Sequence, residues 1–260
     1  MEIPSIRTGN RQGRRRLIRQ PGVEQLLPDI LEVGHVDQTG DLREIGFDGY
    51  AIGGLPRLEQ VPHPRERIEA LRKGRLAGDG GLVTLAMAIL GPDYSVWEVV
   101  CEDIRLAREL GLISSSHTRR QEDATTKDGY ARLLKAGLLG PDHNLVHGTS
   151  FSDAELSVVV DSGATLTSTV LVELHHHVGD TMVARYRAMG GLPSLGIDVE
   201  PFCSGQMFRE MQAALLFARG REIRNNAMRG NSIPKSMPVK SREALIWATL
   251  GGAKAFGLER

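Results

Sequence analysis

From residue 82 onward, short apolar runs alternate with longer amphipathic segments, and this alternation restricts the fold more than any other feature of the sequence. The stretch "GLVTLAMAILGP" (81–92) is a continuous apolar run that ends in Gly-Pro, which is typical of a strand buried on both faces. The next stretch, "SVWEVVCEDIRLARELG", opens with a capping box of Ser95 and Glu98, has apolar residues at helical spacing, and stops at Gly111. A buried strand followed by a helix is the repeating unit of α/β folds.

The same unit recurs four more times. Further strands are predicted in "LISSSHT", "HNLVHG", "ATLTSTV" and the run that ends at Asp198, and helices in "KDGYARLLKAG", "SDAELSVVVDSG", "DTMVARYRAMGG", "GQMFREMQAALLFARG" and "SREALIWATLGGAKAFG". Five consecutive β/α units with right-handed crossovers predict a parallel sheet, either open and doubly wound or closed into a barrel. Because no Gly-x-Gly-x-x-Gly follows the first strand, a (β/α) barrel of the TIM type is favoured.

Composition limits the class of protein and its partners. With 260 residues, 41% apolar and 25% charged, the chain can form one barrel or two small domains. Lysine plus arginine equals aspartate plus glutamate at 32 each, so we expect neither nucleic acid nor a membrane as partner. The run Arg14, Arg15, Arg16 is expected to be solvated. Two cysteines, no long apolar span and no signal peptide favour the cytoplasm.

Three ionisable residues follow three different predicted strands. His117 ends "LISSSH", His147 ends "HNLVH", and Asp198 ends "GLPSLGID". In parallel barrels the chemistry lies at the carboxyl ends of the strands. Imidazole and carboxylate groups are ligands that hold zinc or iron while leaving a position open for water. The sequence therefore predicts a candidate divalent-metal site at this rim.

From about residue 82 to 260 the chain resembles the amidohydrolase superfamily, in the branch of deaminases and chlorohydrolases that act on cytosine, guanine, triazines and thioadenosine-like compounds. The resemblance rests on "LISSSHT", "NLVHG" followed by "SDAEL", "GLPSLGIDVEP" and "ALIWATLGGAKAFGL". It implies a metal-dependent hydrolase of C–N or C–Cl bonds in aromatic nitrogen heterocycles, with one zinc or iron ion. It further implies that His117 and Asp198 bind the metal, that His147 faces water and substrate, and that Asp198 accepts the proton of the attacking water.

Two positions depart from the family pattern. Arg120 stands where deaminases of this family place a glutamate, three residues after the histidine that matches His117, with Glu122 nearby. The His-x-His pair on the family's first strand has no counterpart. His35 and Asp37 in "GHVDQ" have the i, i+2 spacing of one strand face, although a polar loop fits them as well. We therefore expect weak zinc binding and turnover far below that of a complete relative. The alternative is a degenerate, non-catalytic barrel that retains a base-sized pocket.

The segment after the predicted strand "ATLTSTV", "VELHHHVGD", offers candidate substrate contacts in Glu173 and His175, and a solvated loop is the alternative. Residues 42–55, "LREIGFDGYAIGGL", resemble the strand of tRNA-guanine transglycosylases that ends in a Gly-Gly-Leu loop beside guanine. There Gly53 and Gly54 would let the backbone approach a flat ligand. The nucleophilic aspartate stretch and the cysteine-rich zinc site of that family are absent.

These observations divide the chain into residues 1–60, a barrel-strand fragment of separate ancestry, and residues 61–260, the C-terminal part of an amidohydrolase-like barrel. "HPRERIEALRKG", with Pro64 at its start and Gly74 at its stop, is the predicted first helix of the second part. A partial barrel leaves a strand edge open, so self-association into a homo-oligomer is expected. The other expected partner is a small heterocyclic substrate.

Overall fold

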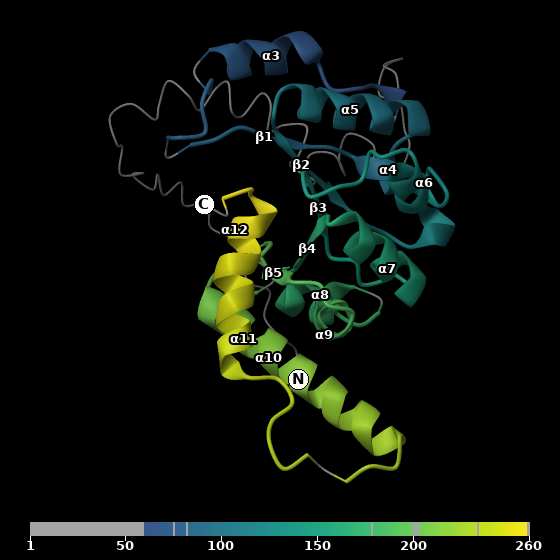
Figure 1. The fold of residues 1–260 in the computed structure, drawn as a ribbon, viewed down its shortest axis with the longest axis vertical. Coiled ribbons are helices and arrows are strands. Elements are labelled where there is room, and N and C mark those ends of the chain that lie inside the picture. Colours follow the sequence, from purple (N-terminus) through teal and green to yellow (C-terminus); the bar gives the residue numbers. More distant parts are fainter. Residues whose placement is uncertain are drawn as a thin grey trace, which may run out of the picture.

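The computed structural model describes residues 60–258 except 75, 82, 178, 200–202 and 233. A parallel sheet of five strands in the order β1-β2-β3-β4-β5 forms the centre of this part (Figure 1). The strands are β1 (Ala86–Ala88), β2 (Ile113–His117), β3 (His143–Val146), β4 (Thr165–Ser168) and β5 (Pro193–Leu195). All four pairings are parallel, and neighbours in the sheet are consecutive in the sequence. This is the predicted series of β/α units.

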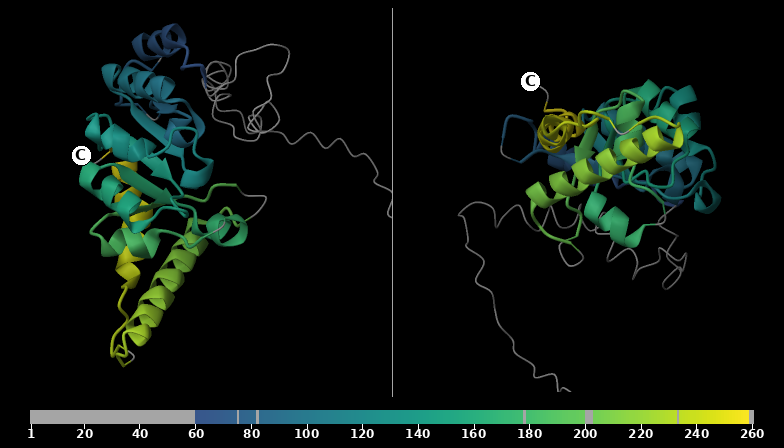
Figure 2. Two further views of the ribbon diagram at one scale, coloured as in Figure 1. Left: turned by 90° about the vertical axis from the view of Figure 1, so that its right-hand side faces the viewer. Right: turned by 90° about the horizontal axis from the view of Figure 1, so that it is seen from below.

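Helices connect and cover the strands. They are α3 (Arg65–Lys73), α4 (Gly91–Tyr94), α5 (Trp97–Glu109), α6 (Gly129–Lys135), α7 (Asp153–Ser162), α8 (Val170–His176), α9 (Val183–Ala188), α10 (Met207–Met228), α11 (Ser241–Ile246) and α12 (Gly252–Ala255), with a 3₁₀ turn η2 (Gln121–Asp123) and a π turn η3 (Trp247–Gly251). The long α10 and the loop after it project from the body (Figure 2). Among the helices described, none combines the length and the apolar character that a membrane crossing requires.

The two predicted capping boxes differ in outcome. In α7 the Oγ of Ser152 accepts a hydrogen bond from the backbone N of Glu155 at 3.2 Å, and the Glu155 carboxylate accepts from the Ser152 N at 2.7 Å, so this prediction is confirmed. The box of Ser95 and Glu98 is wrong, because α5 begins after Val96 without a side-chain cap. A short helix, α4, occupies the residues before Ser95. Ser95 itself is buried, and its backbone carbonyl accepts a hydrogen bond from the Oγ1 of Thr126.

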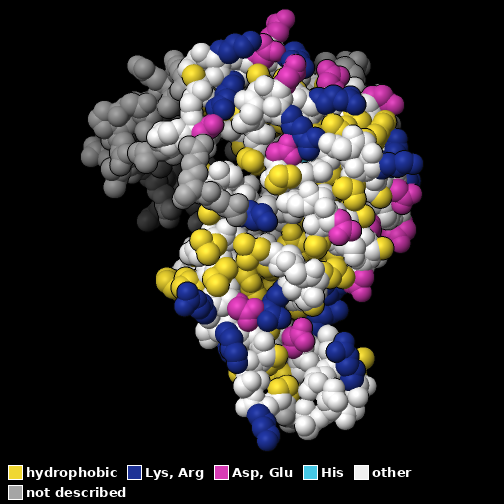
Figure 3. Space-filling model, viewed as in Figure 1, with side chains coloured by type: hydrophobic (Ala, Val, Ile, Leu, Met, Phe, Trp, Pro, Cys, Tyr) yellow, Lys and Arg dark blue, Asp and Glu magenta, His cyan; other side chains and the backbone are white. Residues whose placement is uncertain are grey.

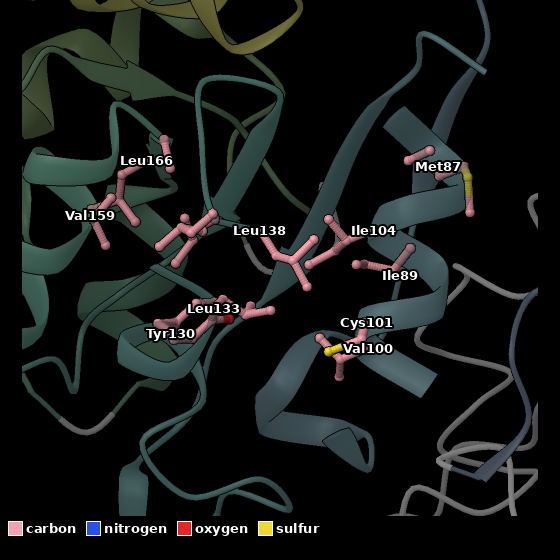
Figure 4. Packing of buried hydrophobic residues seen from close by; sticks show 14 of the residues in the cluster. Met87, Ile89, Val100, Cys101, Ile104, Tyr130, Leu133, Leu138, Val159 and Leu166 are labelled. Atoms are coloured by element: carbon pink, nitrogen blue, oxygen red, sulfur yellow. The ribbon is translucent and has the colours of Figure 1, made fainter. Parts of the chain in front are cut away.

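The two faces of the sheet differ in polarity. One face packs on α5, α6 and α7, where Leu145 and Leu166 are fully buried among residues that include Ile104, Leu133 and Val159 (Figure 4). On the opposite face, hydrogen bonds link the side chains of neighbouring strands: Asn144 donates to Ser115 at 3.1 Å and accepts from Thr165 and Thr167 at 2.9 Å each. The apolar face forms the main core. The polar face carries the side chains that lead, along each strand, to the residues at its carboxyl end.

A second core joins β5 to the C-terminal helices through Leu195, Ala214, Ala244 and Trp247. The π turn η3 touches the first residue of β5 so closely that a Cβ on Gly251 would lie 2.1 Å from the carbonyl O of Pro193. The segment after α12 then reaches the start of β2, where a Cβ on Gly257 would meet Ile113. The C-terminal helices therefore cover the amino ends of the strands, which leaves the carboxyl ends for the candidate site.

Apolar side chains gather on the face of the molecule where α11 and α12 lie (Figure 3). Leu245, Leu250 and Phe256 are 49%, 60% and 67% exposed there. An exposed apolar area of this kind is compatible with self-association, which stays a prediction.

Candidate functional site

Three predicted site residues meet at the carboxyl ends of the strands. His117 is the last residue of β2, His147 directly follows β3, and Asp198 follows β5. The Nδ1 of His117 lies 3.1 Å from the Nε2 of His147, and that nitrogen lies 4.0 Å from the Oδ2 of Asp198. The parallel topology thus brings residues that are far apart in the sequence into one cluster, with His147 at its centre.

The backbone at two of these residues adopts the left-handed conformation. His147 has φ = 76° and Asp198 has φ = 64°, values that are uncommon for residues other than glycine. The turn at His147 is held by its backbone N, which donates to the carbonyl O of Thr167 at 2.8 Å, and by the N of Gly148, which donates to the Oγ1 of Thr118 at 2.8 Å. Backbone strain of this type concentrates at functional sites, where the surrounding structure maintains it.

His147 is 5% exposed and has polar partners on both ring nitrogens. Its Nδ1 lies 3.1 Å from the Oγ1 of Thr169 and 3.5 Å from the Oε1 of Glu173. The Glu173 carboxylate is fully buried, where it accepts hydrogen bonds from the Oγ of Ser168 at 2.6 Å and from the backbone N of Thr169 at 2.7 Å. Glu173 therefore faces His147 and the first turn of α8, and it is closed to solvent.

The segment predicted as a loop contact with substrate is helix α8, not a loop. In that helix His175 is exposed, whereas the ring of His177, just after the helix, packs edge-on against His147 with centroids 4.4 Å apart. The Nδ1 of His177 also lies 3.3 Å from the Oγ1 of Thr149. The sequence analysis singled out this histidine-rich segment but chose His175 from it and not His177. A helical reading of the segment would have found it, because residues four apart such as Glu173 and His177 share one helix face.

Glu210 is a further buried acid that sequence reasoning missed. It comes from the first turn of α10, is 1% exposed, and accepts from the backbone N of Leu171 at 3.4 Å through each carboxylate oxygen. Burial raises the pKa of Glu210 to about 7, and the nearby charges of Glu173 and Asp198 act in the same direction. It fixes the start of α8 and thereby the position of Glu173.

The segment after His117 is anchored by a buried aspartate in α4. Asp93 is fully buried; its Oδ2 accepts from the backbone N of Arg119 at 2.8 Å and its carbonyl O accepts from Thr125 N at 3.0 Å. Within the described residues its Oδ1 has no hydrogen-bond partner, and burial raises the pKa of Asp93 to about 7. The anchoring fixes the path of the chain as it leaves β2.

Arg120 and its neighbour Glu122 lie in the exposed segment that follows β2. Arg120 pairs with Asp123 at 2.9 Å through a side chain that is 55% exposed. Glu122 lies exposed in the turn η2. Neither side chain is buried in the His147 cluster.

The described residues do not complete a metal site. In the described ranges, no group of three or more His, Cys, Asp or Glu side chains is arranged to hold a metal ion, whereas zinc is held by three or four protein ligands. The candidates His35, Asp37, Gly53 and Gly54 lie outside the described residues. Metal binding by His117 and Asp198 therefore stays a prediction.

Comparison with known proteins gives three relevant similarities, although no family model matches the chain. The chain is 32% identical over 129 residues to a 5-methylthioadenosine/S-adenosylhomocysteine deaminase of Teredinibacter turnerae. The aligned residues make up 49% of this chain and 27% of that relative. A zinc-bound adenosine deaminase of Xanthomonas campestris superposes with a TM-score of 0.61 at 21% identity, over 74% of this chain and 43% of that one. An atrazine chlorohydrolase of Arthrobacter aurescens complexed with zinc superposes with a TM-score of 0.62 at 18% identity, over 75% of this chain and 43% of that one.

These similarities confirm the predicted fold class and leave other expectations open. The resemblance of residues 42–55 to tRNA-guanine transglycosylases gains no support from the comparisons, and those residues lie outside the described ones. The chain spans less than half the length of the relatives it matches. Over that span it has the same parallel α/β fold as the adenosine deaminase and the atrazine chlorohydrolase.

Proposed function

We propose that this chain carries the C-terminal part of a hydrolase site that removes an amine or a chloride from an aromatic nitrogen heterocycle. The observation that carries the proposal is the convergence of His117, His147 and Asp198 at the carboxyl rim. The fold is shared with an adenosine deaminase and an atrazine chlorohydrolase, both in zinc-containing structures. In parallel barrels this rim is where catalytic residues gather.

The exposure of the three side chains suits different roles. The Asp198 side chain is 23% exposed, so its carboxylate can meet a water molecule and accept a proton from it. His147 is almost fully buried, so its ring is the one we assign to orienting the substrate, whereas His117 lies partly exposed beside it and is assigned to the metal. A small flat heterocycle is the substrate class proposed.

A divalent cation, zinc or iron, is part of the proposal and would supply a water of lowered pKa as the nucleophile. His117 and Asp198 are the proposed ligands, and His35 and Asp37 are the first residues to test for the rest. A degenerate barrel with a base-sized pocket remains the second candidate. The observation that favours it is the lack of a three-donor group among the described residues.

Substrate turnover by the purified full chain, supplied with zinc or iron, tests the proposal. Ammonia release from guanine, cytosine and adenosine-like compounds, and chloride release from a chlorotriazine, would be measured for the wild type and for Asp198→Asn. A matched control is Asp161→Asn, which changes an exposed carboxylate on α7. We expect slow turnover that is lost with Asp198→Asn and kept with Asp161→Asn. Absence of turnover in a folded, metal-supplied sample would favour the degenerate barrel.

A further inference from the structure

Thr169 occupies the junction between β4 and α8, where it contacts the two central groups of the site. It is the N-cap residue of α8 and is 3% exposed. Its Oγ1 lies 3.1 Å from the Nδ1 of His147 and 3.5 Å from the Oδ2 of Asp198. The second distance is at the outer limit of a hydrogen bond. One hydroxyl therefore lies between an imidazole and a carboxylate.

The partners set the direction of these hydrogen bonds. An ionised carboxylate only accepts, so the hydroxyl of Thr169 donates toward Asp198 and accepts from His147. Glu173 places a second acceptor, its Oε1, 3.5 Å from the same Nδ1. Both neighbours of Nδ1 are thus acceptors, which favours the tautomer that carries its proton on this nitrogen. The Nε2 of His147 then accepts from the Nδ1 of His117 at 3.1 Å.

Glu173 also fixes Thr169 itself. Its Oε1 accepts from the Thr169 backbone N at 2.7 Å, and its Oε2 accepts from Ser168, whose hydroxyl lies 2.7 Å from that of Thr181. Glu173, Ser168 and Thr181 are all fully buried. Hydrogen bonds in such a water-excluded network are stronger than in solvent, and the β-branched Thr169 side chain has few rotamers to choose from.

We propose that Glu173 and Thr169 are positioning residues that act through His147: together they hold its ring in place with the proton on Nδ1, so that Nε2 faces His117 and Asp198 with a lone pair. The catalytic consequence rests on the proposed function, because it concerns how His147 meets substrate. The tautomer is a property of the folded chain and holds without substrate.

The tautomer can be measured directly. The full chain would be labelled with ¹⁵N-histidine and kept free of metal and substrate at about pH 8.5, about two units above the ordinary pKa of imidazole. Two-bond ¹H–¹⁵N spectra then distinguish protonated from bare ring nitrogens, and His147→Gln assigns the signal among the eight histidines. We expect the Nδ1–H form to dominate in the wild type.

Two variants each remove one of the two acceptors beside the Nδ1 of His147 and leave the other acceptor in place. Glu173→Gln removes the charge and keeps the size, and Thr169→Val removes the hydroxyl and keeps the branched shape; each is expected to raise the population of the Nε2–H form. Thr169→Ser restores the hydroxyl and should restore the wild-type spectrum. The matched control is Thr165→Val, which removes a buried hydroxyl on β4 that donates to Asn144. It should leave the His147 signal unchanged.

The outcomes separate this proposal from the proposed function. If neither Glu173→Gln nor Thr169→Val changes the tautomer of His147, or if the wild type carries its proton on Nε2, the proposal is overturned. If the tautomer shifts but no substrate is turned over by any chain, the positioning stands and the hydrolase function fails. Where turnover is found, Glu173→Gln and Thr169→Val should each lower kcat by about 10- to 100-fold, by analogy with groups that orient metal-ligating histidines, with KM changed less than about threefold.

Discussion

The Nε2 of His147 lies 3.1 Å from the Nδ1 of His117 on one side and 4.0 Å from the Oδ2 of Asp198 on the other. One buried imidazole thus joins the ends of three strands, β2, β3 and β5. Because these strands are parallel, their carboxyl ends share one rim, and no single segment of the chain could make this arrangement alone.

His177 is expected to contribute more to activity than His175. The ring of His177 packs on His147, whereas His175 is exposed on α8. On a substrate that the chain turns over, His177→Ala should lower kcat/KM by about tenfold or more, because a displaced His147 is costly in rate. His175→Ala should have the smaller effect. Steady-state kinetics of both variants check this, and a larger loss with His175→Ala would contradict the placement of α8.

Two adjacent glycines of the C-terminal helix should respond in opposite ways to alanine. A Cβ on Gly251 would lie 2.1 Å from the carbonyl O of Pro193, whereas a Cβ on Gly252 meets only the Oγ of Ser194 at 4.0 Å. Gly251→Ala should therefore cost about 1–3 kcal/mol of stability through overpacking. Gly252→Ala should be neutral or gain up to about 1 kcal/mol, since alanine favours the helix. Urea unfolding of the two variants measures both, and equal effects would show that this helix does not rest on β5.

The sequence predicted the strands better than the segments between them. Short segments between amphipathic stretches, which end in His117, His147 and Asp198, indicate strands locally, and their parallel order follows from general rules of topology. Helix α8 was missed because its seven residues follow β4 almost without a turn and end in two histidines, which have no strong helix preference. The Ser95 box failed because the burial of Ser95 under the segment around Thr126 overrode a local signal.

The contacts around His147 depend on long-range packing that no local pattern reveals. Glu210 reaches α8 from α10, and Asp93 reaches the segment after β2 from α4. Both are acids in otherwise ordinary helical stretches, so their burial is visible only in the folded chain.

The buried Asp93 should make the protein more stable as the pH falls. Its folded-state pKa of about 7 lies above the ordinary value of 3.8, so the folded state binds the extra proton between these two values. Above about pH 7 the folded state bears the full free-energy cost of burying the Asp93 charge, and this cost disappears toward pH 4. Asp93→Asn, which keeps an oxygen for the N of Arg119, should gain stability over the wild type at pH 8, by at most about 4 kcal/mol, and little at pH 4. A pH series of unfolding curves tests this; a gain that does not vary with pH would contradict it.

The buried His143 should make the protein less stable as the pH falls, which is the opposite of the effect of Asp93. It is 1% exposed, and its ring nitrogens lie 2.8 Å and 3.0 Å from the hydroxyls of Ser114 and Ser116. Burial lowers the pKa of His143 to about 4 from 6.5, so the unfolded chain binds a proton in this window and the folded chain does not. Stability from this group is complete above pH 6.5 and falls by up to about 3 kcal/mol as the pH drops to 4.

The variant His143→Gln isolates that contribution. Glutamine has no titration in this range, so the stability difference between wild type and variant should narrow, or reverse in favour of glutamine, as the pH falls from 6.5 to 4. Chemical unfolding at four or five pH values across the window measures it. A difference that stays constant would mean that the His143 ring is solvated or charged in the folded chain.

The most direct test of the central claim, that the rim built by His117, His147 and Asp198 carries out hydrolysis, is the incorporation of oxygen from water into product. The full chain with zinc would be incubated with 5-methylthioadenosine in ¹⁸O-labelled water and the products analysed by mass spectrometry. The account predicts a deaminated product with one ¹⁸O for each ammonia released, formed far more slowly than by a complete relative, and neither product nor ammonia with Asp198→Asn. Labelled product that forms equally with Asp198→Asn, or unchanged substrate throughout a wider panel of aminated and chlorinated heterocycles with folded, zinc-supplied wild type, would contradict it.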